Sequence, residues 1–365
     1  NLRRGFSRRQ SMNNILHKKG LQKMKKVKVA VLGASGYAGE ELLRILLRHP
    51  GVEIVAITSR KNAGEPVSAV FPRFTGAPLH FVAPDAAELA KKCDAAILAL
   101  PHGLATEYAI PLLNAGVKVF DISADFRLKS AAKYKEYYKV DHPAPELLAK
   151  AVYGLPERYR EQLRTADLVA CAGCYPTSSI LPTAPLLAAG LVSPEGIIVS
   201  SCSGVTGAGR KVDLPYIFPE CNESLKAYGV VGHRHLPEIE QEMAFAAGVS
   251  EMAINFIPHL APMNRGINST IIMNAAPGCT LEKITEVYEK AYGNEQFVRV
   301  LPPKRCADTK YVFMTNTCEI GYNLDAHTNK VIVTSCIDNL TKGASGQAVQ
   351  CMNIRFGLDE AAGLL

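Results

Sequence analysis

The stretch VKVAVLGASGYAGEELLRILLRHP, residues 27–50, decides the fold of this chain. VKVAVLG is a continuous apolar run that ends in glycine, which is typical of a buried parallel strand. The leucines of EELLRILLRHP recur at the spacing of an amphipathic helix that ends before Pro50. VEIVAITS, residues 52–59, predicts a second strand. A glycine-rich turn therefore joins strand, helix and strand in one βαβ unit.

The turn GASGYAG, residues 33–39, predicts a phosphate-binding loop. Its glycines let backbone N–H groups approach a pyrophosphate, and the N-terminus of the following helix favours the negative charge. The spacing GxxGxxG differs from the commoner GxGxxG, and a purely structural tight turn is the alternative. The context favours a dinucleotide, with contacts expected from Gly33, Ser35, Gly36, Tyr37, Ala38 and Gly39.

The end of the second strand indicates which dinucleotide is bound. An NAD site usually places Asp or Glu there, on the ribose 2′-OH. This chain has Ser59, Arg60 and Lys61 instead, a hydroxyl and two cations that suit a 2′-phosphate. The sequence therefore favours NADP as the cofactor. The alternative is that the two cations belong to a solvated loop.

Further strands continue the alternation. Residues 93–101 and 117–123 predict strands, and residues 104–116 between them predict a helix. This is the pattern of a doubly wound α/β fold, in which ligands bind at the carboxyl ends of the strands. We therefore expect Pro101 and His102, after the first of these strands, to face the cofactor. The alternative for His102 is a surface loop.

Arg127 lies in SADFR, just beyond the next strand end. A guanidinium is the natural partner of a carboxylate or a phosphate, so Arg127 is a candidate anchor for an anionic substrate. An ion pair with Asp121 or Asp125 is an equally good interpretation of its position.

The stretch ACAGCYPTSS, residues 170–179, contains two cysteines in different settings. A strand is predicted over 167–171, which makes Cys171 a small buried side chain. Cys174 is expected at the N-terminus of the next helix, where the dipole would lower the pKa of its thiol. Pro182 and Pro185 are expected to kink or divide that helix. A redox pair fits the surrounding pattern less well, and a zinc site fits it less well still.

A nucleophilic cysteine needs a proton acceptor, and GHRHLPEIEQEM, residues 232–243, offers one. His233 and His235 lie on the extended approach to a predicted helix, so both imidazoles can face one site with Arg234 turned away. The nearby helix N-terminus disfavours a charged imidazole and keeps the base neutral. The HxH spacing also suits a metal ion, but no third ligand is evident nearby, and no metal is expected.

Composition excludes several classes of protein. The 365 residues are 48% hydrophobic and 21% charged, as in ordinary globular enzymes, and no apolar run is long enough for a membrane span. Nine of the 41 basic residues fall in 1–26, which leaves 32 against 34 acidic residues, a net charge of −2. The folded body therefore shows no basic excess for nucleic acid or membrane binding. The 10 cysteines are expected to be reduced, as in a cytoplasmic protein.

The basic segment 1–26 is expected to be a disordered tail. An over-extended or added start, with Met24 or Met12 as the native beginning, is the favoured interpretation. A transit peptide and a nucleic-acid arm are the alternatives.

Three later segments add candidates for ligand contact. SGVTGAGR, residues 203–210, is a second glycine-rich stretch, in which Ser203 and Gly204 are expected at the substrate. Arg265 precedes an apolar strand and is a further candidate for the substrate. Residues 339–358 predict a turn and a closing helix that can pack back on the first domain. Ser178 and Asn339 complete the expected cofactor contacts.

The chain resembles the N-acetyl-γ-glutamyl-phosphate reductase family, within the aspartate-semialdehyde dehydrogenase superfamily. The matching segments run in family order from about residue 27 to 358: GASGYAGEELLRIL, LPHG, SADFRL, GCYPTS, SGVTGAGR, GHRHLPEIEQ, PMNRG and KGASGQAVQ. The chain departs from the family pattern at 171–174, where Asn-Pro-Gly-Cys is usual, and at 200–202, where Asp-Ala-Lys is usual. Both departures bear on acyl-chain preference.

The resemblance implies roles for the candidate residues. Cys174 would be the nucleophile, His233 and His235 the acid/base pair with His235 favoured, and Arg127 the anchor for phosphate or substrate carboxylate. It implies a Rossmann domain over 27–172 and 339–365 and an α/β, mixed-sheet substrate and dimerisation domain over 173–338, assembled as a homodimer or homotetramer.

The resemblance also implies a reaction. NADPH would reduce N-acetyl-γ-glutamyl phosphate to N-acetylglutamate 5-semialdehyde and phosphate, through a cysteine thioester, in arginine biosynthesis. One alternative is the same chemistry on the one-carbon-longer N-acetyl-aminoadipyl phosphate of lysine biosynthesis. Others are a non-catalytic NADP-binding sensor and a metal-dependent hydrolase that uses the HxH pair.

Overall fold

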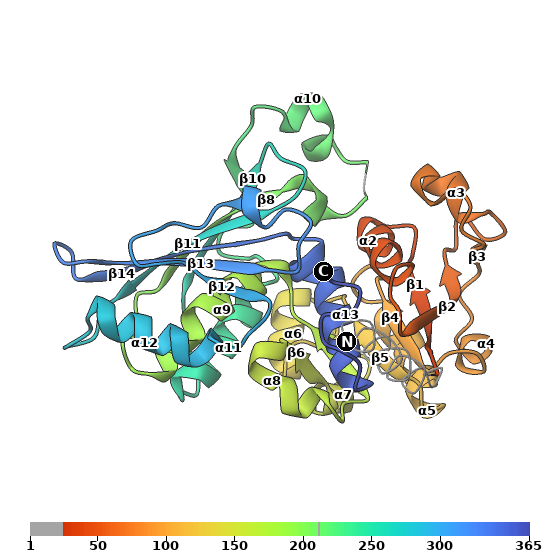
Figure 1. Cartoon of the computed structure of the whole chain (residues 1–365), viewed down its shortest axis with the longest axis horizontal. Coiled ribbons are helices and arrows are strands. Elements are labelled where there is room, and N and C mark those ends of the chain that lie inside the picture. Colours follow the sequence, from red (N-terminus) through yellow and green to blue (C-terminus); the bar gives the residue numbers. More distant parts are fainter. Residues whose placement is uncertain (1–24, 211) are drawn as a thin grey trace, which may run out of the picture.

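Two seven-stranded sheets organise the molecule, each with its own helices (Figure 1). The computed structural model describes residues 25–210 and 212–365. The first sheet has the order β3-β2-β1-β4-β5-β7-β6, and all its strand pairs are parallel. Its strands are β1 (Val27–Leu32), β2 (Val52–Thr58), β3 (Phe81–Val82), β4 (Ala95–Leu98), β5 (Lys118–Asp121), β6 (Val152–Gly154) and β7 (Leu168–Cys171). The predicted doubly wound fold is confirmed. The expected basic tail falls almost entirely outside the described residues.

Helices cover both faces of the parallel sheet because its strands are apolar on both sides. On one face Val29 and Val31 pack against α2 (Tyr37–Leu46) and α13 (Gly346–Arg355). On the other, Ala30 and Leu32 pack against α4 (Ala86–Ala90), α5 (Ala105–Asn114) and α7 (Pro145–Lys150). The shorter helices of this half are α3 (Val67–Val70), η1 (Pro72–Phe74), α6 (Ala131–Tyr138) and α8 (Pro156–Leu163).

The second sheet is mixed, with the order β12-β13-β14-β11-β8-β10-β9. Its strands are β8 (Ile198–Gly204), β9 (Lys226–Ala227), β10 (Asn255–Ala261), β11 (Ile267–Asn274), β12 (Val298–Val300), β13 (Cys318–Asp325) and β14 (Lys330–Ile337). The helices α9 (Cys174–Ala188), α11 (Leu236–Ala247) and α12 (Leu281–Tyr292) share one apolar core with this sheet, below it in Figure 1. Short turns of helix complete this half: η2 (Val205–Ala208), η3 (Leu214–Tyr216), α10 (Phe218–Cys221) and η4 (Thr309–Tyr311).

Helix α9 runs on as one helix through Pro182 and Pro185, so the prediction that these prolines divide it is wrong. A proline lacks the N–H that would bond the carbonyl four residues earlier. For Pro185 that carbonyl belongs to Leu181, and the hydroxyl of Tyr292 on α12 donates to it at 2.5 Å. The neighbouring helix therefore satisfies a backbone acceptor that the proline leaves open.

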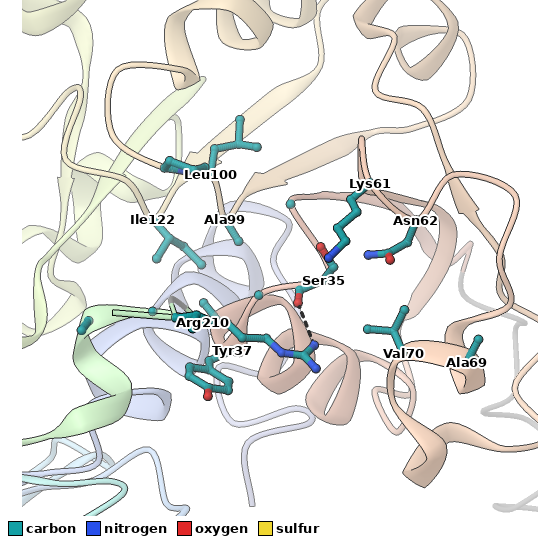
Figure 2. A pocket seen from close by; sticks show the side chains of 17 residues that line it. Ser35, Tyr37, Lys61, Asn62, Ala69, Val70, Ala99, Leu100, Ile122 and Arg210 are labelled. Carbon is teal, nitrogen blue, oxygen red and sulfur yellow. Dashed lines mark hydrogen bonds between the residues drawn. The ribbon is translucent and has the colours of Figure 1, made fainter. Parts of the chain in front are cut away.

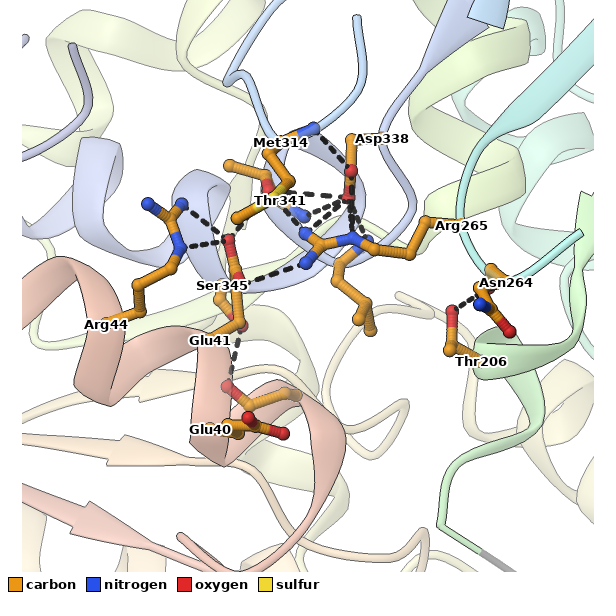
Figure 3. Close-up of polar contacts among 12 residues, drawn as sticks. Glu40, Glu41, Arg44, Thr206, Asn264, Arg265, Met314, Asp338, Thr341 and Ser345 are labelled. Carbon is orange, nitrogen blue, oxygen red and sulfur yellow. Dashed lines mark hydrogen bonds and ion pairs between the residues drawn. The ribbon is translucent and has the colours of Figure 1, made fainter. Parts of the chain in front are cut away.

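The C-terminal segment joins the two halves. η5 (Thr341–Ser345), a single turn of π-helix, leads into α13, and Ser345 Oγ donates to the carbonyl of Ala38 at 2.8 Å. Figure 3 shows Arg265, from the second half, reaching Glu41 of α2 at 3.1 Å and Asp338 at 2.9 Å. These buried contacts fix the glycine-rich turn relative to the second domain.

Candidate active site

Gly33 makes the sharp exit from β1 possible. Its φ is +77°, a conformation that costs little only for glycine, and a Cβ there would collide with the carbonyl oxygen of Ala99 beyond β4. Gly36 then caps α2 without any side-chain hydrogen bond, so the first amides of the helix stay open to a ligand. The turn thus leaves room for an anion at the helix N-terminus.

A cleft of about 800 Å³ opens above this turn (Figure 2). It is lined by seven of the residues predicted to bind cofactor: Gly33, Ser35, Gly36, Tyr37, Ala38, Lys61 and Pro101. Ala99 and Ile122 line its inner end, at the carboxyl ends of β4 and β5. The donor-rich turn, the size and the depth fit a dinucleotide.

The cations of the cleft differ in part from those predicted. Arg60 is held by Glu107 at 3.1 Å and by the hydroxyl of Tyr108 at 2.7 Å, and it does not line the cleft. Lys61 does line it. Arg210 was missed: its Nη1 donates to the carbonyl of Ser35 at 3.3 Å, so it crosses the cleft from the second domain (Figure 2). The signal was present, since Arg210 ends the glycine-rich stretch SGVTGAGR.

Three other predicted cofactor residues lie behind the residues that line the cleft. Gly39 packs against the backbone of Ala34, and Ser59 Oγ lies 3.0 Å from Ser35 Oγ. His102 Nδ1 lies 2.7 Å from a carboxylate oxygen of Asp125, which also accepts from two loop amides. These residues shape the loops around the cleft.

Ser178 lies inside the second domain, and Asn339 contacts that domain. Ser178 is fully buried in α9, and its hydroxyl lies 2.8 Å from that of Ser269 on β11. Asn339 accepts from the amide of Gly266 at 2.7 Å and donates to the hydroxyl of Thr206 at 3.0 Å. Neither lines the cleft.

Cys174 is the first residue of α9, as predicted, and η5 presses on it. A Cβ on Gly343 would lie 2.8 Å from the Cβ of Cys174, so only glycine allows this approach. Burial raises the pKa of the Cys174 thiol to about 11, and the nearby Arg127 guanidinium offsets this only in part. The predicted lowering of this pKa is therefore wrong, because the cost of burying a thiolate outweighs the field of the helix N-terminus.

The two histidines lie together, as predicted, but the approach to α11 is a turn and not the extended segment expected, with His235 at φ −81° and ψ −13°. Their ring centroids are 5.1 Å apart, and His233 Nδ1 accepts from the amide of His235 at 3.1 Å, while Arg234 between them is exposed. His235 lies beside Gly173, the residue before the nucleophile: a side chain on Gly173 would begin 2.7 Å from its Nε2. Burial lowers the pKa of His233 to about 4 and holds that of His235 well below its usual value. Both imidazoles are therefore neutral bases.

Arg127 connects the cleft to the thiol. Its Nη2 donates to the carbonyl of Ile122 at 2.6 Å and its Nε to the carbonyl of Cys171 at 2.8 Å. Its Nη1 lies 3.4 Å from His235 Nε2 and 3.3 Å from Glu238. The ion pair is thus with Glu238, which the sequence interpretation missed although it lies in the matching segment GHRHLPEIEQ.

The remaining substrate candidates differ in accessibility. Ser203 and Gly204, at the end of β8, are buried, and Ser203 Oγ donates to the carbonyl of Gly204 at 3.1 Å. Arg265 is committed to the ion pairs with Glu41 and Asp338 (Figure 3). Cys202, at one of the departures from the family pattern, alternates with Ser201 and Ser203 along β8 and so lies on the sheet face opposite α9.

Among residues 25–210 and 212–365, no three His, Cys, Asp or Glu side chains gather as a metal site. In the same part of the chain, no helix combines the length and apolarity that crossing a bilayer requires.

Two family models of known proteins match the chain, one in each half. Residues 28–166 match the family model "Semialdehyde dehydrogenase, NAD binding domain", and residues 174–339 match "Semialdehyde dehydrogenase, dimerisation domain". These matches support a nicotinamide cofactor and assembly of more than one chain. A solved aspartate semialdehyde dehydrogenase II from Vibrio cholerae is 17% identical, with a TM-score of 0.71 over 91% of this chain and 99% of that one, which shows a shared fold.

Curated relatives are much closer in sequence. The N-acetyl-gamma-glutamyl-phosphate reductase of Akkermansia muciniphila is 52% identical over 93% of this chain and 99% of its own length. That of Moorella thermoacetica is 47% identical over 93% and 98%. The chain belongs to the N-acetyl-gamma-glutamyl-phosphate reductase family.

Proposed function

We propose that this protein reduces N-acetyl-γ-glutamyl phosphate to N-acetylglutamate 5-semialdehyde and phosphate with NADPH, a step of arginine biosynthesis. One observation carries the proposal: Arg127 reaches from Ile122, on the wall of the dinucleotide cleft, to His235. His235 in turn lies beside Gly173, the residue before Cys174. A nucleophile, a base and a cation thus meet where the nicotinamide end of a dinucleotide would reach.

In this proposal His235 starts the reaction. The thiol of Cys174 is protonated at neutral pH, whereas the imidazole of His235 is neutral, so the thiol proton moves to His235 as the sulfur attacks the acyl carbon. The carbon–oxygen bond to phosphate breaks, a thioester forms on Cys174, and the phosphate takes its proton from solvent. Arg127 Nη1, the least tightly held nitrogen of its guanidinium, is the donor offered to the departing phosphate.

The glycine-rich turn at Gly33–Gly36 and Lys61 would hold NADPH, which when bound would supply the hydride that reduces the thioester carbon. The carbon–sulfur bond then breaks to release the aldehyde, and the proton on His235 returns to the sulfur. His233 is the second base of the pair, and its contact with the amide of His235 holds the segment in place.

NADP rather than NAD is the proposed cofactor. No acidic residue stands at the end of β2, whereas Lys61 and Arg210 both line the cleft. A 2′-phosphate would find cationic partners there, and a bare ribose would find no carboxylate. We expect kcat/KM with NADPH to exceed that with NADH by at least tenfold, and a ratio near one would refute this choice.

The division of the chain and its assembly belong to the same proposal. We assign 27–172 and 339–365 to cofactor binding and 173–338 to catalysis, with a homodimer or homotetramer as the working unit. Light scattering on the purified protein distinguishes these states.

The direct test is phosphate-dependent reduction of NADP⁺ with N-acetylglutamate semialdehyde. We expect activity that requires phosphate and disappears in Cys174→Ala. Activity that is independent of phosphate, or greater with the aminoadipate homologue, would overturn the proposed substrate.

A further inference from the structure

Glu238 is a buried carboxylate that contacts three parts of the active site. It lies in the first turn of α11, one turn after His235, and is 1% exposed. Its Oε1 accepts from the hydroxyl of Tyr153 at 2.7 Å and from the amide of Gly173 at 2.8 Å. Its Oε2 lies 3.3 Å from Arg127 Nη1.

These partners come from different elements. Tyr153 belongs to β6, Gly173 precedes α9, and Arg127 lies in the loop after β5. A buried carboxylate is costly unless it is paired and fully hydrogen-bonded, and an apolar side chain would pack there at less expense. The cost of burying the Glu238 carboxylate indicates that its negative charge has a role in the active site beyond packing.

We propose that Glu238 is a positioning residue, which holds the Gly173 amide and the Arg127 guanidinium in register with His235 and offsets the charge that Arg127 presents to the Cys174 sulfur. The inference rests on the proposed function, because it concerns the same site.

The geometry of Arg127 carries the first part. Its other two nitrogens are fixed by backbone carbonyls, whereas Nη1 is shared between Glu238 and His235 at 3.3 and 3.4 Å. Without the carboxylate, Nη1 loses its ion pair and turns toward the sulfur or the imidazole. The imidazole lone pair that should accept the thiol proton would then be occupied.

The charges around the sulfur carry the second part. Arg127 from the loop after β5 and Glu238 from the start of α11 both act on the Cys174 thiol, as do the phenols of Tyr175 and Tyr228. His235 lies beside Gly173, and η5 contributes the uncharged Gly343. Arg127 lowers the pKa of the Cys174 thiol and Glu238 raises it. Removal of the Glu238 charge should therefore make the thiol more acidic and the turnover slower, a combination that simple loosening of the fold would not give.

The test is Glu238→Gln in the full chain, which keeps the shape of the side chain and removes its charge. We expect kcat to fall by about 100-fold, the size of effect that misplacement by about 1 Å produces. KM for the acyl phosphate should change much less. The pH midpoint for alkylation of Cys174 by iodoacetamide, followed by mass spectrometry of its peptide, should move to lower pH.

Glu242→Gln is the matched control, because Glu242 lies one turn further along α11, is equally buried, and accepts from Tyr159 at 2.5 Å without touching Gly173 or Arg127. It should retain wild-type kcat and alkylation midpoint. Tyr153→Phe removes one donor and keeps the charge, so kcat should fall by about tenfold, the low end of the worth of one hydrogen bond to a charged group, with the midpoint unchanged. This variant decides the question if Glu238→Gln does not fold.

An unchanged midpoint in folded Glu238→Gln, or an equal loss of kcat in Glu242→Gln, overturns the inference. If the wild-type protein does not reduce the acyl phosphate, the proposed function fails, and the alkylation comparison still decides the role of Glu238.

Discussion

The dinucleotide cleft opens over a glycine-rich backbone turn, whereas the thiol site at Cys174 brings together charged side chains from distant parts of the chain. The cleft depends on local geometry, such as the positive φ of Gly33 and the uncapped start of α2. The thiol site depends on Arg127, Glu238 and His235, which are up to 111 residues apart. Substitutions in the two regions should therefore fail in different ways, one in cofactor binding and the other in turnover.

The largest expected effect separates the regions most clearly. Cys174→Ala should lower kcat by about 10⁴-fold or more, because no other group can form the thioester. The dissociation constant for NADPH, measured by fluorescence titration, should stay close to that of the wild-type protein. Cys171→Ala is the control, since Cys171 is packed in the core of the first domain. Turnover by Cys174→Ala at a near-normal rate would contradict the expected difference between the cofactor cleft and the thiol site.

The two histidines provide the next comparison. His235→Asn should lower kcat by about 10³-fold, within the range for loss of a general base, and His233→Asn by about tenfold. The base works in its neutral form, which is lost only as the pH falls through its pKa. Because burial lowers the pKa of His233 to about 4 and depresses that of His235, kcat should be flat between about pH 5 and 7. An acid limb with a midpoint near 6.5 would contradict the assignment.

A substitution at Gly33 tests the cofactor cleft and not the thiol site. Gly33→Ala should destabilise the fold by roughly 2–3 kcal/mol and weaken NADPH binding, because strain at positive φ adds to the collision with Ala99. Gly64→Ala adds only the strain of a positive φ, which is +93° at Gly64, because no atom lies within 4 Å of the new Cβ. It should lower the free energy of unfolding by about 1 kcal/mol. Thermal unfolding measures both. Equal losses would show that the contact with Ala99 contributes nothing.

The smallest expected effect concerns the two cations after β2. Lys61→Ala should weaken NADPH binding by about tenfold and NADH binding hardly at all, because Lys61 lines the cleft. Arg60→Ala should change neither by more than about twofold, since Arg60 is exposed and pairs with Glu107. Titration with both nucleotides is the measurement. A larger effect at Arg60 would place the 2′-phosphate outside the cleft as described.

The sequence predicted the cleft well because strand, turn and helix are consecutive there. The apolar run, the glycine spacing and the leucine periodicity all act within 30 residues, and β1, β2 and α2 follow them closely. The commitment of Arg60 to Glu107 could not be predicted, since it depends on how α5 lies beside the strand ends.

The thiol site was predictable in its residues and not in its energetics. Cys174 was correctly placed at a helix start, but its pKa depends on burial by η5, which lies 169 residues later in the chain. Glu238 and Arg210 carry no local signal apart from the matching segments that contain them. Pairings between distant elements, such as Glu238 with Arg127, are tertiary facts that periodicity does not encode.

The position of α13 has a consequence for biosynthesis. It supplies Ala348, Val349 and Met352 to the apolar layer that β1 also faces, yet the ribosome adds it after the whole second sheet. On the domain division proposed above, the nucleotide half stays incomplete until α13 has been made, whereas residues 173–338 are already present. We therefore expect the second half to close first, the reverse of the usual order of assembly during translation.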